Sequence, residues 1–500
     1  MRWWLLAALA GLALAPLAGL LARVWLEGGR ISGADGLLVL DQMQYVNWLR
    51  QAGAHGLIAN AYDLAPGPRS FLHPGLLISG GLNQLGLGAI ASYLVWKPVA
   101  VLALWWGAVR WSERFVSDQR SRWMVACIAL LFASPLAALV GWSGLGGQSL
   151  KFDFDFLSGE LTAGNYLWGY LFTAISVGLM PLVLLAYERG RFGLAGCGGL
   201  IVAWLQPWQG ATLILVVLGV EAWRWAATRR RPALGPAVLV SAAIAAPLVY
   251  YLVLSRVDES WELAGIANDF GTWPLWVTVV GLAPLVLPAL TAPRPSFDSF
   301  GELALRVWPL AALAVFVLPF GTFPAHALQG MVLPLVTLAF LGVAGRLGIV
   351  ALALLIVVMV VPGTLYRADQ LRGAVQAGRQ PFFVRDGEHA ALRWLDRQPS
   401  AGGVLAPIYS GLLVPAHTRR ETWVGAGSWT PDFDSRVQRA EALFSGRMDR
   451  PAAERMVRST GARFVFSDCQ GRADIGSLLA GITVAPPRRF GCATVWEVRP

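Results

Sequence analysis

Residues 3–24 read WWLLAALAGLALAPLAGLLARV, a run in which Arg23 is the one charged side chain. A helix needs about 20 mostly apolar residues to cross the hydrocarbon core of a bilayer, so this run is long enough to span. A secretory signal peptide has a shorter apolar core and a small-residue cleavage site, which residues 13–19 imitate. The length of the run and its leucine-rich end favour a retained first membrane helix.

The rest of the chain has the same apolar character. Of its 500 residues, 56% are hydrophobic and 14% are charged, against about 25% charged residues in an ordinary soluble protein. Further apolar segments lie at residues 88–109, 123–142, 167–187, 194–206, 208–226, 235–255, 274–292, 307–320, 331–345 and 347–365. The sequence therefore predicts an α-helical polytopic membrane protein with about eleven transmembrane helices. The pair of segments interrupted at Gln206–Gly210 is either a tight helical hairpin or one broken helix.

The net charge of +10 does not indicate nucleic-acid binding, because its distribution follows the apolar segments. One set of connections carries Arg110, Arg114, Arg120, Arg122, Arg189 and Arg191, and the alternate set carries Asp35, Asp41, Asp63, Asp153, Asp155 and Glu160. Basic loops of membrane proteins stay in the cytoplasm. We therefore expect the N-terminus inside and the acidic loops outside.

The chain changes character after residue 365. Residues 1–365 are expected to form the transmembrane domain, with a large first external loop at 26–87. Residues 366–500 are expected to form a soluble extracytoplasmic domain, whose alternating helices and strands indicate a small α/β fold. The expected helices are 388–397, 431–444, 451–460 and 475–479, and the expected strands are 403–408, 463–467 and 493–498.

Cys469 and Cys492 lie in this last domain, just after one expected strand and just before another. If those strands are neighbours, the two thiols are close enough for a disulfide, which an oxidising compartment allows. The alternative is a pair of reduced cysteines.

The sequence contains no motif of soluble catalysis. It has no Walker A sequence, no paired Cys-x-x-Cys zinc site and no nucleophile elbow. The remaining candidates are polar groups of the external loops. Asp153 and Asp155 alternate with phenylalanines, so an extended segment would place both acids on one face. Such a pair suits Mg²⁺ or Mn²⁺ bridging to a lipid phosphate, and the alternative is an interfacial aromatic loop with solvated acids.

Residues 40–54 of the first loop indicate a helix on which Asp41, Tyr45 and Trp48 share one face. Short motifs follow in chain order: Asp41-Gln42-Met43-Gln44-Tyr45, Tyr62-Asp63-Leu64-Ala65, Phe71-Leu72-His73-Pro74, Arg393-Trp394-Leu395, Gly403-Val404-Leu405-Ala406, Arg419-Arg420 and Trp423-Val424-Gly425. In order and topology, most of the chain resembles the GT-C superfamily of membrane glycosyltransferases. The resemblance implies a bacterial cytoplasmic membrane enzyme that moves a sugar from a polyprenyl-phosphate donor to a glycan, lipid or protein acceptor on the outer face.

The resemblance also implies a general base in the first loop. Many members of the superfamily carry an acidic pair where this chain has Asp41-Gln42, which leaves Asp41 and Asp35 as candidates. Asp41 is preferred because its helix holds it beside Tyr45, whereas Asp35 lies in a glycine-containing loop. A carboxylate suits the removal of a proton from an acceptor hydroxyl. The alternative role for Asp41 is to cap an interfacial helix.

Lys97 is the candidate for holding the donor phosphate, because a charge within an apolar segment is costly and usually faces the protein interior. Further substrate-binding candidates are Tyr45, Asp63, His73, Gln206, His326 and Arg420. For each histidine and for Arg420, a structural role in a loop is the alternative. No organic cofactor is indicated, and a divalent metal ion is the one cofactor candidate.

Three other functions fit parts of the sequence. A polymerase or ligase of lipid-linked glycans would share outward-facing chemistry. A transporter or flippase would show inverted repeats and charges at mid-membrane. The third is a non-catalytic assembly protein whose outer domain binds a partner.

Overall fold

The computed structural model describes residues 2–65, 67–229, 233–268, 274–318, 323–343, 346–376, 381–470 and 473–499. The chain forms two compact units. The helical unit comprises residues 1–15, 96–253 and 269–372, and the mixed unit comprises residues 16–95, 254–268 and 373–500. The domain boundary expected at residues 365 and 366 stays a prediction.

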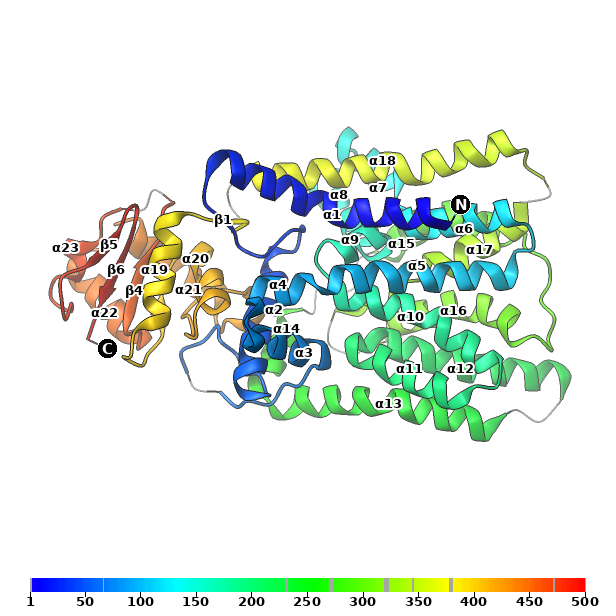
Figure 1. Ribbon diagram of the computed structural model, residues 1–500, viewed down its shortest axis with the longest axis horizontal. Coiled ribbons are helices and arrows are strands. Elements are labelled where there is room, and N and C mark those ends of the chain that lie inside the picture. The colour runs from blue at the N-terminus through cyan, green and yellow to red at the C-terminus, as the bar shows by residue number, and fades with distance from the viewer. Residues whose placement is uncertain are drawn as a thin grey trace. The chain divides into compact units, whose positions relative to one another are not determined.

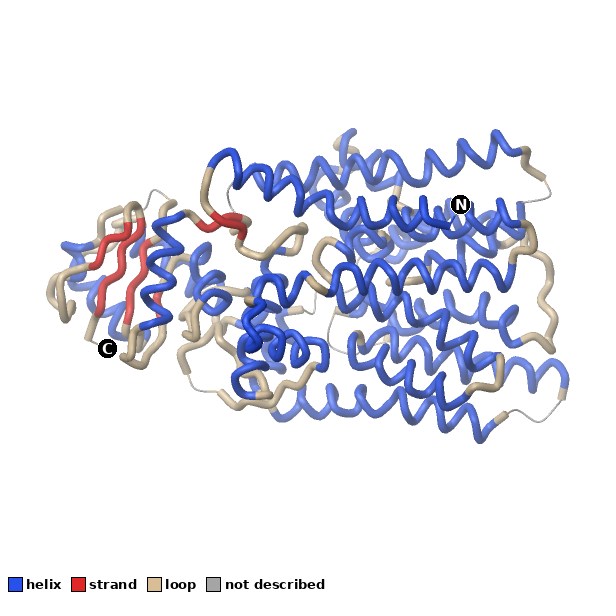
Figure 2. Tube along the Cα trace, viewed as in Figure 1, coloured by secondary structure: helices blue, strands red, loops and turns tan. Residues whose placement is uncertain are grey.

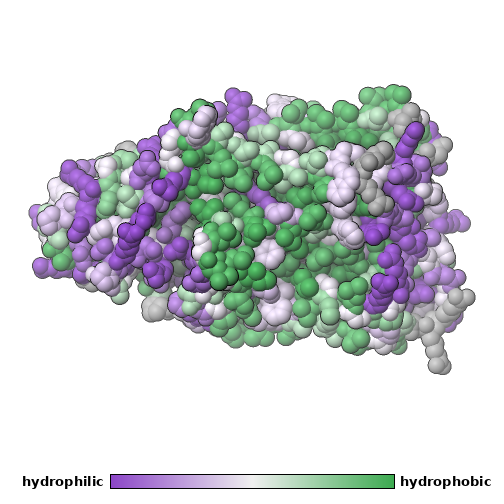
Figure 3. Space-filling model, viewed as in Figure 1, coloured by the Kyte–Doolittle hydropathy of each residue, from purple (hydrophilic) through white to green (hydrophobic). Residues whose placement is uncertain are grey.

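Among the described residues, eight helices are long and apolar enough to cross a membrane. They are α1 (Arg2–Glu27), the consecutive α4 (Ala89–Leu94) and α5 (Trp96–Phe115), α10 (Leu171–Glu188), α12 (Pro207–Thr228), α13 (Leu234–Val257), α16 (Phe300–Val317), the consecutive η2 (Pro324–Leu328) and α17 (Val332–Val343), and α18 (Ile349–Gln376). The pair α6 (Gln119–Leu131) and α7 (Pro135–Ser143), bent by 41°, is a ninth candidate, and α11 (Phe192–Leu205) and α15 (Leu275–Ala289) are shorter apolar helices. Figure 3 shows apolar side chains spread widely over the face that it presents.

The predicted polytopic helical architecture is confirmed, whereas the number of crossings stays a prediction. Every predicted apolar segment coincides with one or more of these helices. The last residues of the predicted segments 307–320 and 331–345 lie outside the described residues. Figure 1 shows the long helices of the helical unit running side by side.

Small residues bring α5 and α10 into close contact. A Cβ atom at Gly107 would lie 2.1 Å from the carbonyl oxygen of Gly178, and one at Gly178 would lie 2.4 Å from the carbonyl carbon of Ala103. Apolar side chains gain little by exchanging lipid for protein, so membrane helices associate through close packing at small residues. A larger side chain at either glycine would force the two helices apart.

Gln206 separates α11 from α12. Its extended backbone, with φ −154° and ψ 102°, ends α11, and Pro207 begins α12 at a position where proline is well tolerated. The two helices pack against each other (Figure 1). Of the two alternatives for this region, the tight helical hairpin is therefore the one observed.

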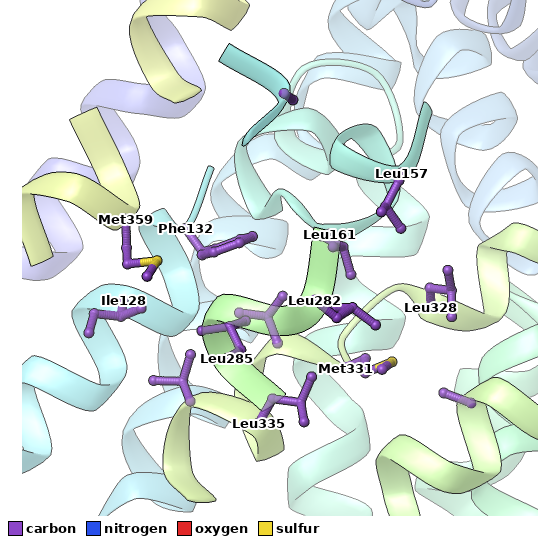
Figure 4. Packing of buried hydrophobic residues seen from close by; sticks show 14 of the residues in the cluster. Ile128, Phe132, Leu157, Leu161, Leu282, Leu285, Leu328, Met331, Leu335 and Met359 are labelled. Atoms are coloured by element: carbon purple, nitrogen blue, oxygen red, sulfur yellow. The ribbon is translucent and has the colours of Figure 1, made fainter. Parts of the chain in front are cut away.

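One apolar core holds α8 (Gly147–Leu161) against the short helix η2. Leu157 and Leu161 of α8 and Leu328 of η2 belong to the same buried cluster, together with Leu282 of α15 and Met331. Figure 4 shows these side chains pointing toward a common interior. The packing fixes the end of α8 relative to η2, and each segment carries a polar residue described below.

The prediction that residues 152–156 form an extended segment is wrong, because they lie within α8. Successive residues of a helix are about 100° apart, so Asp153 and Asp155 do not share one face. The helical pattern is visible in the rings, since Phe152 is 54% exposed and Phe154 is 4% exposed. An alternating Phe-Asp sequence fits a strand locally, but the helix buries Phe154, Leu157 and Leu161 on one side.

The mixed unit begins with short elements of the first loop. They are β1 (Arg30–Ile31), α2 (Val39–His55), α3 (Pro74–Leu82), the π-helix η1 (Asn83–Leu87) and α4, joined by α14 (Glu259–Ala267) from later in the chain. The predicted helix at 40–54 is confirmed as α2. Strand β1 pairs antiparallel with β2 (Phe383–Val384), so the first loop and the C-terminal region share a two-stranded sheet (Figure 2).

The C-terminal region is the predicted small α/β fold. Its elements are α19 (Asp386–Arg397), β3 (Val404–Leu405), α20 (Ile408–His417), η3 (Gly427–Trp429), α21 (Phe433–Phe444), α22 (Arg450–Thr460), β4 (Phe464–Ser467), α23 (Gly476–Leu479), β5 (Arg488–Phe490) and β6 (Ala493–Glu497). The four strands are ordered β3-β4-β6-β5, with β3 and β4 parallel and the other pairs antiparallel. The sequence missed β5 and α20.

Cys469 and Cys492 form a disulfide. Strands β4 and β6 are neighbours, with Ser467 opposite Thr494, so each cysteine lies just beyond a pair of bonded strands. The predicted disulfide is confirmed, and it forms because the two strands that flank the cysteines are neighbours, as expected.

Candidate functional site

Asp41 lies in the first turn of α2, and Tyr45 and Trp48 follow at the spacing that places them on its side of the helix. The residue is half-buried. Because the N–H groups of a first helical turn lack partners within the helix, a carboxylate is favoured there. Burial raises the pKa of Tyr45 and Tyr62 well above the usual value, and the negative charge of Asp41 raises both further. Asp41 is thus close to two phenols that stay protonated at neutral pH.

A cluster of aromatic rings fixes the rotation of α2 about its axis. The ring centroid of Trp48 lies 4.9 Å from that of Phe71 and 5.4 Å from that of Trp429. Trp261 completes the cluster, with its centroid 5.1 Å from that of Trp429. The side of α2 that carries Trp48 is therefore packed against protein, which limits the directions that Asp41 can take.

Gln42 closes the loop in front of α2. Its Oε1 accepts hydrogen bonds from the backbone N–H groups of Asp35 at 3.1 Å and Gly36 at 3.0 Å. Its Nε2 donates to Asp35 Oδ1 at 2.9 Å. Asp35 is 1% exposed, so its carboxylate is a buried part of this loop. This arrangement favours Asp41 over Asp35 as the acid that meets a substrate.

Asp63 and His73 both have structural contacts. Arg436 Nη1 donates to Asp63 Oδ1 at 2.8 Å, which ties the first loop to α21. His73 caps α3, and its Nδ1 accepts a hydrogen bond from the Leu76 N–H at 3.3 Å. The role of either side chain in substrate binding stays a prediction.

Arg420 and Lys97 are buried and donate to backbone carbonyls. The guanidinium of Arg420 reaches the carbonyl oxygens of Leu395 at 2.7 Å, Gly402 at 2.7 Å and Gln398 at 2.8 Å, and so holds the end of α19. Lys97 is 2% exposed. In the helical unit, its Nζ donates to the carbonyl oxygens of Leu167 at 2.6 Å and Ala13 at 3.2 Å. Contact of either cation with a phosphate stays a prediction.

A second polar cluster lies within the helical unit and contains two predicted residues, Gln206 and His326. His326 Nδ1 lies 3.0 Å from Glu160 Oε2, and Gln329 Nε2 donates to the same oxygen at 2.8 Å. Gln206 Nε2 is 3.3 Å from Gln329 Oε1 and donates to Thr173 Oγ1 at 3.0 Å. Glu160 comes from the end of α8, His326 from η2 and Gln206 from the break before α12, so three separate segments meet here.

Sequence reasoning did not single out Glu160 and Gln329 as site residues. Gln329 lies three residues after His326, a spacing that brings side chains together on a helical turn. Glu160 stands out only as one acid among several in the external loops. Its partner is 166 residues away in sequence, and no local pattern encodes that contact.

The two metal candidates have separate environments. Tyr366 Oη and Gln370 Nε2 donate to Asp155 Oδ2 at 3.1 Å and 2.7 Å, and Arg367 donates to its backbone oxygen. Burial raises the pKa of Asp155, partly opposed by the charge of Arg367, and burial also raises that of Asp153. Within the described ranges, no group of three or more His, Cys, Asp or Glu side chains is arranged to hold a metal ion. Binding of a metal ion by Asp153 or Asp155 stays a prediction.

No known family profile matches the sequence, and no curated protein matches it. Solved structures do match the fold. The oligosaccharyltransferase of Archaeoglobus fulgidus, in complex with Zn and sulfate, aligns with a TM-score of 0.51 and 13% identity over 93% of this chain and 68% of the other. ArnT from Cupriavidus metallidurans, bound to undecaprenyl phosphate, aligns with a TM-score of 0.51 and 13% identity over 90% of this chain and 92% of the other.

Both of these proteins are GT-C glycosyltransferases. The predicted resemblance is therefore confirmed at the level of the fold: the chain shares the fold of these two proteins, that of a multi-pass helical membrane protein with a small C-terminal sheet.

Proposed function

We propose that the chain is a glycosyltransferase that moves one sugar from a polyprenyl-phosphate donor to an acceptor hydroxyl. The reaction would take place on the outer face of a bacterial cytoplasmic membrane, with the N-terminus inside and residues 366–500 outside. The observation that supports it best is the half-buried Asp41 in the first turn of α2, in a chain with the GT-C fold. ArnT binds undecaprenyl phosphate, and the archaeal enzyme AglB has been solved with dolichol-phosphate, which supports a lipid-phosphate carrier.

Asp41 acts as the general base. Its carboxylate accepts the proton of the acceptor hydroxyl while that oxygen forms a bond to the anomeric carbon of the donor sugar. The bond from the anomeric carbon to the carrier phosphate breaks, and the carrier phosphate leaves with the bonding electrons. The dipole of α2 helps to keep Asp41 ionised between turnovers. The nearby phenols of Tyr45 and Tyr62 remain neutral donors, because burial and Asp41 both raise their pKa.

The structure offers a matched control for this assignment. Asp41→Asn removes the base without changing side-chain size. Asp35→Asn removes a carboxylate from the same loop but keeps an oxygen that can accept from Gln42 Nε2, the contact seen at 2.9 Å. We expect Asp41→Asn to lower transfer by at least about 100-fold, and Asp35→Asn to keep most of it.

The assay incubates purified full-length protein with a panel of radiolabelled undecaprenyl-phosphate sugars and membrane extract as acceptor, and measures released carrier phosphate. A transporter or an assembly protein would release none. Full activity in Asp41→Asn, or equal losses in the two variants, would remove Asp41 from the mechanism.

A further inference from the structure

The hydrogen bonds of the His326 ring lie at its Nδ1 edge. Its Nδ1 lies 3.0 Å from Glu160 Oε2, and Gln329 Nε2 lies 3.2 Å from Nδ1. Gln329 Nε2 donates to the same Glu160 oxygen at the shorter distance of 2.8 Å. Because a carboxylate oxygen only accepts hydrogen bonds, the contact of Nδ1 with Glu160 favours a neutral imidazole with its proton on Nδ1 and its lone pair on Nε2. None of the hydrogen bonds between described residues uses Nε2, and the side chain is 18% exposed. His326 therefore presents a single fixed acceptor.

Aromatic rings enclose this imidazole. The ring centroids of Phe323, Trp208 and Tyr170 lie 4.7, 5.4 and 5.9 Å from that of His326. The Trp208 and His326 planes are nearly perpendicular, at 89°. An apolar wall with one or two precisely held polar groups is the usual composition of a small-molecule site.

The polar groups of the cluster suit hydroxyls better than phosphate. Glu160 contributes a negative charge and its side chain is only 8% exposed, so an anion nearby would be repelled in a medium that screens weakly. Arg367 interacts with the charge of Glu160 and donates to the Asp155 carbonyl and, at 2.7 Å, to Gln370, while its Nε has no hydrogen-bond partner within the described ranges. A hydroxyl supplies the hydrogen that Nε2 needs and brings no charge.

A second acceptor in the cluster lacks a donor. Gln209 is fully buried, and its Nε2 donates to the His326 carbonyl oxygen at 2.7 Å. Its Oε1 has no hydrogen-bond partner within the described part of the chain. A buried oxygen without a donor is costly unless water or a ligand supplies one.

We propose that this cluster is the subsite for the donor's sugar ring. A sugar hydroxyl donates to His326 Nε2, and the rings of Trp208 and Tyr170 line the apolar side of the sugar. Glu160 and Gln329 are positioning residues that fix the imidazole. The inference rests on the proposed function and adds to it the part of the donor that the helical unit recognises.

Two substitutions separate the two edges of the imidazole. His326→Asn keeps an amide near the position of Nδ1, where it can donate to Glu160, but removes the Nε2 edge. His326→Gln extends an amide toward the Nε2 position, where its oxygen can accept. His55→Asn, at an exposed histidine of α2, is the matched control.

The experiment measures binding of two probes to the full-length protein in nanodiscs: undecaprenyl phosphate, and whichever undecaprenyl-phosphate sugar the transfer assay identifies. We expect His326→Asn to weaken binding of the sugar-bearing lipid about three- to tenfold, the effect of losing one hydrogen bond. Binding of undecaprenyl phosphate should change less than about twofold, and His326→Gln should keep most of the affinity. Among donors that lack one sugar hydroxyl, we expect one that binds the wild type more weakly. The affinity of this deoxy donor should not change in His326→Asn, because it lacks the hydroxyl that donates to His326.

Equal weakening of both probes by His326→Asn would overturn the inference, because it would indicate a phosphate contact or a structural role. So would unchanged binding of both probes, or a deoxy series in which no member loses affinity for the wild type. The deoxy series needs no variant, so it can overturn the inference even if His326→Asn fails to fold. A wild-type protein that binds neither lipid would instead refute the proposed function on which the inference rests.

Discussion

Gln42→Glu tests whether the loop in front of Asp41 depends on an amide at position 42. The substitution keeps the shape of the side chain and replaces the donor that reaches Asp35 Oδ1 at 2.9 Å by a carboxylate oxygen. Two carboxylates about 4 Å apart repel by about 4 kcal/mol at an effective dielectric constant of 20. The protein can avoid this repulsion by protonating one carboxyl, which at pH 7 costs about 4 kcal/mol. The loss of stability therefore cannot exceed about 4 kcal/mol. We expect a loss of about 3–4 kcal/mol in the free energy of unfolding.

Asp35→Asn should rescue this loss. An amide at position 35 can donate to the new carboxylate, which still accepts from the backbone N–H groups of residues 35 and 36 as Gln42 does now. Asp35→Asn alone should change stability by less than about 1 kcal/mol, since the donor from Gln42 keeps an acceptor. The double-mutant cycle should therefore show a coupling of about 3–4 kcal/mol.

Stability is measured by equilibrium unfolding of the purified chain in detergent, monitored by tryptophan fluorescence. Sugar transfer from the donor is measured separately for each variant. Because Gln42 follows Asp41 directly, transfer should fall and recover together with stability. A loss below about 1 kcal/mol in Gln42→Glu, or a double variant no more stable than the single one, would refute the role assigned to this amide.

Two further predictions concern the C-terminal region. Replacing both cysteines, Cys469→Ser and Cys492→Ser, should lower the free energy of unfolding by about 3 kcal/mol, because the disulfide closes a loop with a sequence separation of 23 residues. Thermal melts of the oxidised, reduced and doubly substituted protein check this, and a melting temperature that does not change on reduction would contradict it. Burial, and then the positive charges of Arg50 and His389, lower the pKa of His417 from 6.5 to about 4. The folded state then binds fewer protons than the unfolded state between these values, so stability should fall as the pH drops from 6.5 toward 4, by up to about 3 kcal/mol. His417→Asn should flatten this pH dependence in urea unfolding series, and an unaltered slope would contradict the assignment.

The sequence predicted the elements whose pattern is local. Apolar runs identified the membrane helices, and the spacing of Asp41, Tyr45 and Trp48 identified α2. The strands that flank Cys469 and Cys492 identified the disulfide. In each case, the neighbours along the chain carry enough information, because hydrophobic periodicity and pairing of adjacent strands do not depend on distant contacts.

The helix α8 and the cluster around Glu160 could not be predicted in this way. The alternation of Phe and Asp at residues 152–156 fits a strand, and only packing of Leu157 and Leu161 against η2 and α15 selects a helix. The partners of Glu160 come from η2, which is brought near by the same core. Side-chain contacts between segments more than a hundred residues apart depend on how helices pack, and a single sequence does not display that.

The partner of each acidic side chain limits the chemistry that it can perform. Asp63 is paired with Arg436 at 2.8 Å, so its carboxylate is held by an ion pair. Asp35 accepts from Gln42 and is 1% exposed. Glu160 is 8% exposed, and its Oε2 is already in contact with His326 and Gln329. Asp41 is half-buried in the first turn of α2, where the N–H groups that lack helical partners favour a carboxylate. Proton transfer is thus proposed at Asp41 and sugar recognition at His326, and different variants test the two assignments.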